Sequence, residues 1–168
     1  MGHLTNKLDK VLELYHEHPQ QPFTVRAIAR RIGIPKSSVQ LYLRELRRQH
    51  FIDAENRAVP SLLFTTRKIC YFLEKIVSCG LLDFLIKELN PSCIILFGSV
   101  RKGDSVAESD IDMFIESPVK KELDSRPFER RLHHPIQLFV ERNIHDLPPQ
   151  LLNNVVNGIK LQGSFRVK

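Results

Sequence analysis

Apolar residues recur at helical spacing in three successive segments of the first 50 residues. Each segment follows the i, i+3, i+4, i+7 pattern that places apolar side chains on one face of an amphipathic helix. Pro19 ends the first helix, Thr24 is a suitable N-cap for the second, and the turn 33–35 precedes the third. The predicted inward positions are Leu8, Val11, Leu12 and Tyr15, then Val25, Ile28, Ala29 and Ile32, then Val39, Tyr42, Leu43 and Leu46. Two helices joined by a short glycine turn, after a preceding helix, are the layout of a helix-turn-helix.

Residues 51–64 alternate between apolar and polar, with a turn at 53–56, which predicts a two-stranded wing behind the third helix. Helical patterns then run from 65 to 79 and from 81 to 89, with Gly80 as the stop of the first. These two stretches form an apolar connector. It packs either between two domains of one chain or against a second copy, and the pattern alone leaves both arrangements open.

From Cys93 onward the pattern is that of strands. The apolar run 93–97, bounded by turn residues on both sides, predicts a short buried strand, and 111–115 and 135–141 predict two more. A helix is expected over 147–156. The expected fold class is therefore α/β (α+β), with an N-terminal winged helix and a small C-terminal domain built on a mixed sheet.

The positive charge is concentrated in the first part of the chain. Residues 1–68 hold 12 Lys+Arg against 6 Asp+Glu, and residues 69–168 hold 13 of each, so the net charge of +6 belongs to the first part. This asymmetry indicates a module that meets a polyanion; a basic face that only keeps the protein soluble is the alternative. On the third helix, short polar groups face base edges and arginines face phosphates if the partner is double-stranded DNA. The candidate DNA-binding residues are Ser37, Gln40, Arg44, Arg47 and Arg48.

A protein-docking module with solvated arginines remains the other interpretation of the three helices. No apolar run approaches the ~18 residues of a membrane helix, and the N-terminus is too polar for a secretory signal. We therefore expect a cytoplasmic protein with no membrane partner. The three cysteines fit neither a zinc site nor a disulfide framework, and their apolar neighbours predict buried thiols.

Two motifs flank the polar segment between the first two predicted strands. Asp110 and Asp112 begin the second strand two residues apart, so their side chains point to one face, ~6.6 to 6.8 Å apart along the chain. Such a pair suits a hard cation such as Mg²⁺, which prefers oxygen ligands. Gly98 and Ser99 end the first strand, where backbone amides can approach a phosphate closely. Taken singly, each motif has an ordinary alternative: two solvated aspartates and a common turn.

In combination, the order of strand, Gly-Ser, ten residues, Asp-x-Asp and strand closely resembles the minimal nucleotidyltransferases of the DNA polymerase β superfamily. The matching positions are Gly98, Ser99, Lys102, Gly103, Ser109, Asp110, Ile111 and Asp112. The resemblance implies Mg²⁺ and ATP or another NTP as cofactors. It also implies that Asp110 and Asp112 are the catalytic metal ligands, that Gly98 and Ser99 hold the β- and γ-phosphates, and that Lys102 neutralises nearby charge. Gly103 and Ser109 complete the implied nucleotide-binding set.

The implied chemistry uses two metal ions and a third carboxylate on the next strand. This chain has Gln137 at that position, and an amide offers a carbonyl oxygen but no charge. Glu141 lies on the same strand face but ~13 Å along it. The dense charges of 117–134 predict a surface helix or loop, with a role in gripping triphosphate or an acidic partner as the alternative. His133 and His134 are expected at the surface.

Two hypotheses follow. In the first, the protein transfers a nucleoside monophosphate, above all AMP, to a protein or nucleic-acid hydroxyl, and the resemblance to antitoxin-like members implies a HEPN-type partner protein. In the second, the protein is a DNA-binding regulator whose second domain binds nucleotide or a partner without turnover. A homodimer is expected if the helix-turn-helix reads a palindrome. The expected domains are 1–65 for the winged helix, 66–89 for the connector and 90–168 for the nucleotidyltransferase domain.

Overall fold

The computed structural model of the protein describes residues 7–166. The chain divides into two compact units, with the boundary between Lys68 and Ile69. This boundary falls within the helix α4 (Leu62–Ser78). Each unit has its own hydrophobic core and is described by itself.

The first unit contains the three predicted helices. They are α1 (Lys7–Glu17), α2 (Val25–Ile32) and α3 (Lys36–Arg48). Thr24 caps α2, because its hydroxyl accepts the backbone N–H of Ala27 at 3.2 Å. Gly33 ends α2 with φ of +73°, a left-handed conformation that glycine adopts without a side-chain penalty. The predicted helix-turn-helix is thereby confirmed.

The inward faces of these helices meet in one cluster. Most of the predicted inward positions are buried, and Phe23, Phe51, Ile52 and Phe64 complete the cluster from the connecting segments. Every helix therefore contributes a stripe of apolar side chains to a shared core, which is what holds α3 in place as a surface helix.

The expected two-stranded wing is reduced to a single bridge between Ile52 and Ala58. Asp53 N–H donates to the carbonyl of Arg57 at 2.9 Å, so the hairpin turn itself forms. The second strand is cut short because Pro60 has no N–H to donate and because Ser61 starts α4, its hydroxyl accepting the N–H of Phe64 at 3.1 Å.

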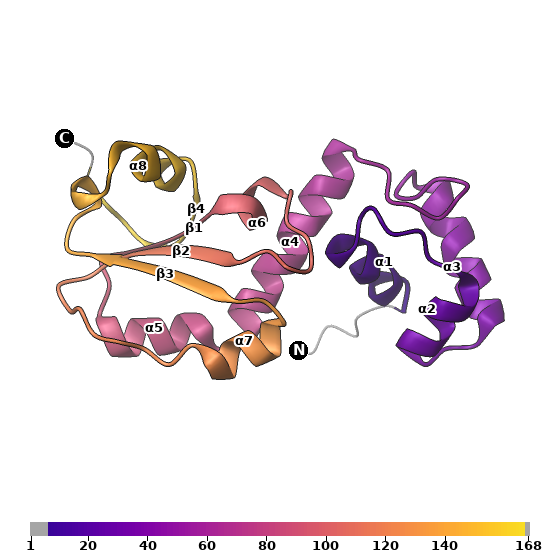
Figure 1. The fold of residues 1–168 in the computed structure, drawn as a ribbon, viewed down its shortest axis with the longest axis horizontal. Helices are drawn as coiled ribbons and strands as arrows, with labels where there is room; N and C mark the ends of the chain where they lie inside the picture. Colours follow the sequence, from indigo (N-terminus) through magenta and orange to yellow (C-terminus); the bar gives the residue numbers. More distant parts are fainter. Residues whose placement is uncertain (1–6, 167–168) are drawn as a thin grey trace. The chain divides into compact units, whose positions relative to one another are not determined.

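The second unit is a four-stranded mixed sheet with helices on both faces (Figure 1). The strand order is β3-β2-β1-β4; β1 is antiparallel to β2 and β4, and β2 is parallel to β3. The strands are β1 (Cys93–Phe97), β2 (Ile111–Glu116), β3 (Ile136–Glu141) and β4 (Ile159–Gly163). The helices are α5 (Leu81–Leu89), α6 (Gly98–Lys102), α7 (Arg126–Leu132), the 3₁₀ turn η1 (Ile144–Asp146) and α8 (Pro149–Val156).

The two faces of the sheet bury different sets of residues. One face packs against α4 and α5 through a cluster that includes Phe72, Ile76, Leu81, Leu85, Ile94, Met113 and Ile115. The other face packs against α8 through a smaller cluster of Cys93, Ile95, Phe97, Phe114, Ile144, Leu147 and Val155. Because strand residues alternate between faces, Asp112 lies on the α8 side, at the end where that cluster stops.

Two expectations about single residues were wrong. His134, expected at the surface, is buried against the ring of Phe72, with centroids 5.2 Å apart, because the turn before β3 folds inward. Cys70, expected to be buried, is exposed, whereas Cys93 is buried in β1. Burial raises the pKa of the Cys93 thiol to about 11, so this thiol stays protonated at neutral pH.

Candidate functional site

The register of β1 and β2 brings the two sequence motifs together. Phe97, the last residue of β1, is the antiparallel partner of Asp112. Gly98 follows with φ of +73°, and a Cβ atom on it would lie 1.9 Å from Oδ2 of Asp112. Only a residue without a side chain fits here, because the Asp112 carboxylate occupies that space. The Gly-Ser turn and the Asp-x-Asp pair therefore form one site.

The two carboxylates of this site influence each other. Asp110 is exposed just before β2, and Asp112 is half-buried on the strand. Burial raises the pKa of Asp112, and the negative charge of Asp110 raises it further. Two carboxylates in mutual repulsion are a donor set that fits a hard divalent cation, which would stabilise both charged forms. Within residues 7–166 no cluster of three or more His, Cys, Asp or Glu side chains is arranged to hold a metal, so the pair has no third such side chain grouped with it.

The helix α6 begins at the same place. Gly98 and Ser99 are its first two residues, and the first four amides of a helix have no acceptor within that helix. Lys102 is its last residue and is exposed, and Gly103 ends the helix in a left-handed conformation, with φ of +78°. The turn therefore presents backbone donors on the side of the Asp112 carboxylate and a lysine one helical turn away.

Ser109 has a structural position in the loop before Asp110. Its hydroxyl accepts the N–H of Val106 at 2.9 Å, and its own N–H donates to the Val106 carbonyl at 2.9 Å. Its carbonyl accepts Nδ1–H of the buried His134 at 2.7 Å. On the other side of Asp110, the N–H of Ile111 donates to the Pro135 carbonyl at 2.9 Å. The backbone on both sides of Asp110 is therefore fixed by the turn before β3.

Sequence reasoning missed this role of His134. A signal was present: His134 immediately precedes the third predicted strand, and a parallel pairing of that strand with the second would have placed it beside Ser109. Neither histidine is on that strand: His133 ends α7 in a left-handed conformation and is exposed, whereas His134 is buried.

Gln137 lies directly beside Asp112. The two are register partners in the parallel pair β2 and β3, and register partners point to the same face. Glu141 is at the far end of β3, where it forms an ion pair with Lys120 at 2.5 Å. The position across from Asp112 thus holds an exposed neutral amide, and the nearest acidic residue of β3 is engaged elsewhere.

The candidate DNA-binding residues share the exposed side of α3. Ser37, Gln40 and Arg44 are all exposed, and Leu41 beside them is 60% exposed. Arg47 donates to the side chain of Asn56 at 2.6 Å. Arg48 donates to both carboxylate oxygens of Glu45, at 2.8 and 2.5 Å. Within residues 7–166, Arg44 is the arginine of this face whose side chain is not held by another side chain.

The comparison with known families decides what the second unit is. The family described as "Nucleotidyltransferase domain" matches residues 78–162, just over half of the chain. The chain belongs to this family. The match covers β1, β2 and β3 and therefore both motifs of the site.

In this nucleotidyltransferase-family protein, residues 9–55 match a second family, described as "IclR helix-turn-helix domain". That match covers most of α1 and all of α2 and α3, so the protein combines a helix-turn-helix DNA-binding domain with a nucleotidyltransferase domain. No curated protein and no solved structure gives a significant match. Among the described helices, none has the length and apolar character needed to cross a bilayer.

Proposed function

We propose that the protein binds a magnesium–nucleoside triphosphate, above all ATP, and transfers the nucleoside monophosphate to a hydroxyl group of a protein or nucleic acid. The observation that carries the proposal is the fit between Gly98 and Asp112, where the glycine leaves room for the carboxylate beside the start of α6. Backbone N–H donors that suit a phosphate and a carboxylate that suits a cation are therefore next to each other, at the start of α6.

Asp110 and Asp112 would hold Mg²⁺. A bound divalent cation supplies charge stabilisation to the triphosphate and to the leaving pyrophosphate. The repulsion that raises the pKa of Asp112 is the cost of keeping the two carboxylates together in the absence of a counter-charge. The chain's own residues hold this pair in place, because hydrogen bonds fix the backbone on either side of Asp110.

The remaining residues orient the reactants. The amides of Gly98 and Ser99 bind the β- and γ-phosphates, and Lys102 offsets their charge. The acceptor oxygen forms a bond to the α-phosphorus while the bond to the β-phosphate breaks, pyrophosphate leaves, and the hydroxyl proton passes to water. Gln137 can orient the hydroxyl through a hydrogen bond, but a neutral amide does not take up its proton.

A second candidate function is favoured by that same residue. Gln137 is the direct neighbour of Asp112, at the position where the family chemistry uses a third carboxylate. A site with two carboxylates and an amide would bind the nucleotide and turn it over slowly. The protein would then be a DNA-binding transcriptional regulator that responds to nucleotide or to a partner protein.

Calorimetric titration of ATP with and without Mg²⁺ tests the shared part of both functions. We expect binding that requires Mg²⁺ in the wild type and that is at least tenfold weaker in Asp112→Asn, since the variant loses the charge of one ligand. Retained binding in Asp112→Asn would contradict the assigned site.

Transfer of label from α-³²P-ATP then separates the two functions. Labelling of an acceptor by the wild type supports the enzyme, and Gln137→Asp should increase it by restoring the third carboxylate. If the wild type binds ATP but labels nothing while Gln137→Asp does, the natural protein is the regulator.

We further propose how the chain is divided, what it binds and where it acts. The domain boundaries 1–65, 66–89 and 90–168, a HEPN-type partner protein, a homodimer on palindromic double-stranded DNA and a cytoplasmic location are proposed together with the transfer reaction. The homodimer is supported by the helix-turn-helix match, because such domains commonly read two half-sites.

A further inference from the structure

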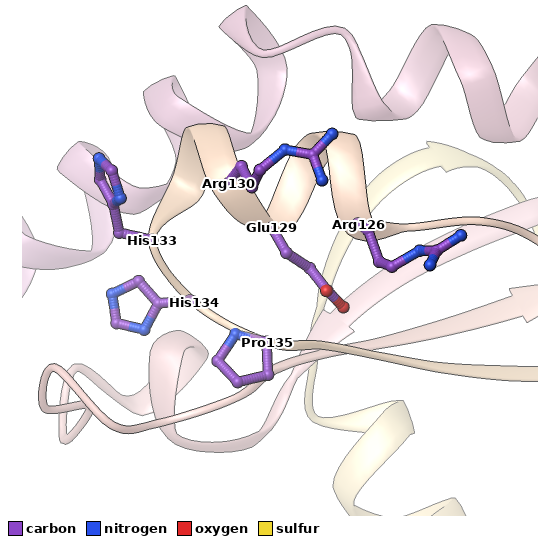
Figure 2. Close-up of a pocket in the computed structure, with 6 residues that line it drawn as sticks. All are labelled: Arg126, Glu129, Arg130, His133, His134 and Pro135. Atoms are coloured by element: carbon purple, nitrogen blue, oxygen red, sulfur yellow. The ribbon is translucent and has the colours of Figure 1, made fainter.

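A pocket of about 410 Å³ opens beside the turn between α7 and β3 (Figure 2). Three of its lining residues come from α7 and three from the turn that leads into the strand. They are Arg126, Glu129 and Arg130, and then His133, His134 and Pro135. The proposed transfer reaction leaves this pocket without a role.

The pocket is next to the Asp-x-Asp pair. In the parallel register, Ile111 pairs with Ile136 and Asp112 with Gln137. One residue earlier, the Ile111 N–H donates to the carbonyl of Pro135. This hydrogen bond holds Ile111, the residue that follows Asp110, against Pro135. A group bound against Pro135 is therefore one strand away from the proposed metal ligands.

The pocket also lies on one particular side of the site. Gly98 and Ser99, the proposed triphosphate contacts, follow β1, whereas the pocket is on the edge strand β3, and β2 lies between the two. Gln137, the residue that faces the attacking hydroxyl, is two residues along β3 from Pro135, or ~6.6 Å. In the order of the strands, the pocket is thus at the β3 edge of the sheet, on the side of Gln137 rather than on that of Gly98 and Ser99.

Its cationic side chains suit an anion. Arg126 and Arg130 are exposed one helical turn apart, and Figure 2 shows both guanidinium groups on the same side of α7. Arg126 also donates to Asp124, through Nε at 2.7 Å and Nη2 at 3.0 Å. Guanidinium groups match phosphate through paired N–H donors. The exposed imidazole of His133 adds a further N–H on the opposite side of the pocket.

Two features limit the negative potential in the pocket. The Glu129 carboxylate is partly used within the protein, because its Oε1 accepts the Ser125 hydroxyl at 2.9 Å and the N–H of Ile136 at 3.2 Å. The carbonyl of Leu132, at the end of α7, accepts from Lys75 Nζ at 3.1 Å. The helix end is therefore balanced by a cation, as helix C-termini favour.

From these observations we infer that the pocket binds a backbone phosphate of a single-stranded nucleic acid whose hydroxyl is the acceptor. The inference rests on the proposed function and specifies its substrate. A nucleic-acid strand carries a phosphate close to every sugar hydroxyl, so one arginine-lined phosphate site beside Gln137 positions any strand end. A protein hydroxyl has no phosphate at a fixed distance. The helix-turn-helix domain in the same chain is consistent with a nucleic-acid substrate.

Fluorescence anisotropy of labelled tetranucleotides tests the inference on the full chain. The probes are tetrauridylate and tetrathymidylate, which are too short and single-stranded to offer a groove to α3. The background carries Arg44→Ala and Arg48→Ala to remove the arginines of α3. In this background, the pocket variant Arg126→Gln/Arg130→Gln is compared with the matched control Lys87→Gln/Arg142→Gln, which removes two exposed charges of the same unit outside the pocket.

The pocket variant should bind at least one of the two probes tenfold or more weakly, and the control should bind as the background does. The dependence of log K on log salt concentration should also become shallower by about 0.7, the value for one lost phosphate contact with a single strand. Glu129→Gln should bind several-fold more tightly, because it removes a negative charge and keeps an acceptor oxygen. A gain in affinity cannot come from unfolding.

The inference is overturned if the pocket variant binds like the control, or if the background binds neither tetranucleotide. It is also overturned if a phosphoserine peptide binds more tightly than both tetranucleotides. Loss of Mg²⁺–ATP binding in the pocket variant would assign the pocket to the triphosphate instead. If the wild type did not bind Mg²⁺–ATP, the proposed function would be wrong. The anisotropy experiment would still show whether the pocket binds a nucleic-acid strand.

Discussion

At the scale of single residues, Gly98 is the position on which the site depends most directly. It combines a left-handed backbone with a carboxylate in the place of its missing side chain. Gly80 offers a matched comparison in the same unit, because its φ is +82° and a Cβ atom there would meet nothing within 4 Å. The two glycines therefore separate backbone strain from steric conflict with Asp112.

We predict that Gly80→Ala costs about 1–2 kcal/mol of unfolding free energy, from the left-handed backbone alone. Gly98→Ala should cost more, because the new methyl group must displace the Asp112 carboxylate. It should also weaken Mg²⁺–ATP binding at least tenfold, whereas Gly80→Ala should leave binding unchanged. Denaturant unfolding and calorimetry measure the two effects. Equal binding by both alanine variants would show that the close approach of Gly98 to Asp112 has no functional consequence.

Residues differ in how far the sequence alone reveals them. Gly98, Asp110 and Asp112 belong to a spaced motif, and the register of β1 and β2 does bring Gly98 and Asp112 together. His134 belongs to no motif. Its role depends on the parallel pairing of β3 with β2, which is a long-range fact that local spacing does not encode. The spacing of a motif therefore indicates which of its residues come together, but not which distant residue fixes their backbone.

At the scale of elements, α3 determines what the first unit can bind. Arg48 already donates to Glu45 in a two-point contact, and Arg47 donates to Asn56. An arginine that is held by a neighbouring carboxylate must give up that contact before it can meet a phosphate. Arg44 does not face this particular cost, so the arginines of one helix face are not expected to contribute equally.

We predict that Arg44→Ala weakens binding to a duplex selected from a random pool more than Arg48→Ala does. The slope of log K against log salt concentration should fall by about 0.9 for Arg44→Ala, the value for one lost phosphate contact with duplex DNA. Arg142→Ala, which removes one exposed charge from the second unit, serves as the control. Fluorescence anisotropy between 50 and 200 mM salt provides the measurement, and an unaltered slope for Arg44→Ala would remove α3 as the phosphate-contacting helix.

Helices were easier to predict than strand pairs. The three helices of the first unit follow from apolar spacing, and Thr24 and Gly33 mark their ends through local chemistry. The prediction of a two-stranded wing was wrong, because the alternation of apolar and polar residues in 51–64 continues into α4. There the Ser61 hydroxyl caps the helix and no second strand forms. In the expected connector, Leu81 and Leu85 of α5 are part of the second unit's own core. No local pattern distinguishes such a core helix from a dimer helix.

At the scale of the whole molecule, the two units have separate cores, so conditions that act on one core need not act on the other. Low pH is such a condition, because it acts on His16 in the first unit. This histidine is buried, with its ring 5.3 Å from that of Phe64. Burial lowers the pKa of His16 to about 3; the positive charges of Lys68 and Arg67 lower it as well, and Glu17 opposes them.

The sign of the resulting pH dependence follows from proton binding. Below its ordinary pKa of 6.5, His16 is protonated in the unfolded chain and neutral in the folded unit, so the unfolded state binds more protons and acid favours it. Between pH 7 and pH 5 this difference amounts to about 2 kcal/mol of lost stability. Hydrogen exchange read by mass spectrometry should therefore show the first unit losing protection over this range, while peptides of the second unit change less. His16→Leu should abolish most of the effect, since leucine does not titrate. A loss that is equal in both units, or that persists in His16→Leu, would mean that the two cores are coupled or that another group carries the acid sensitivity.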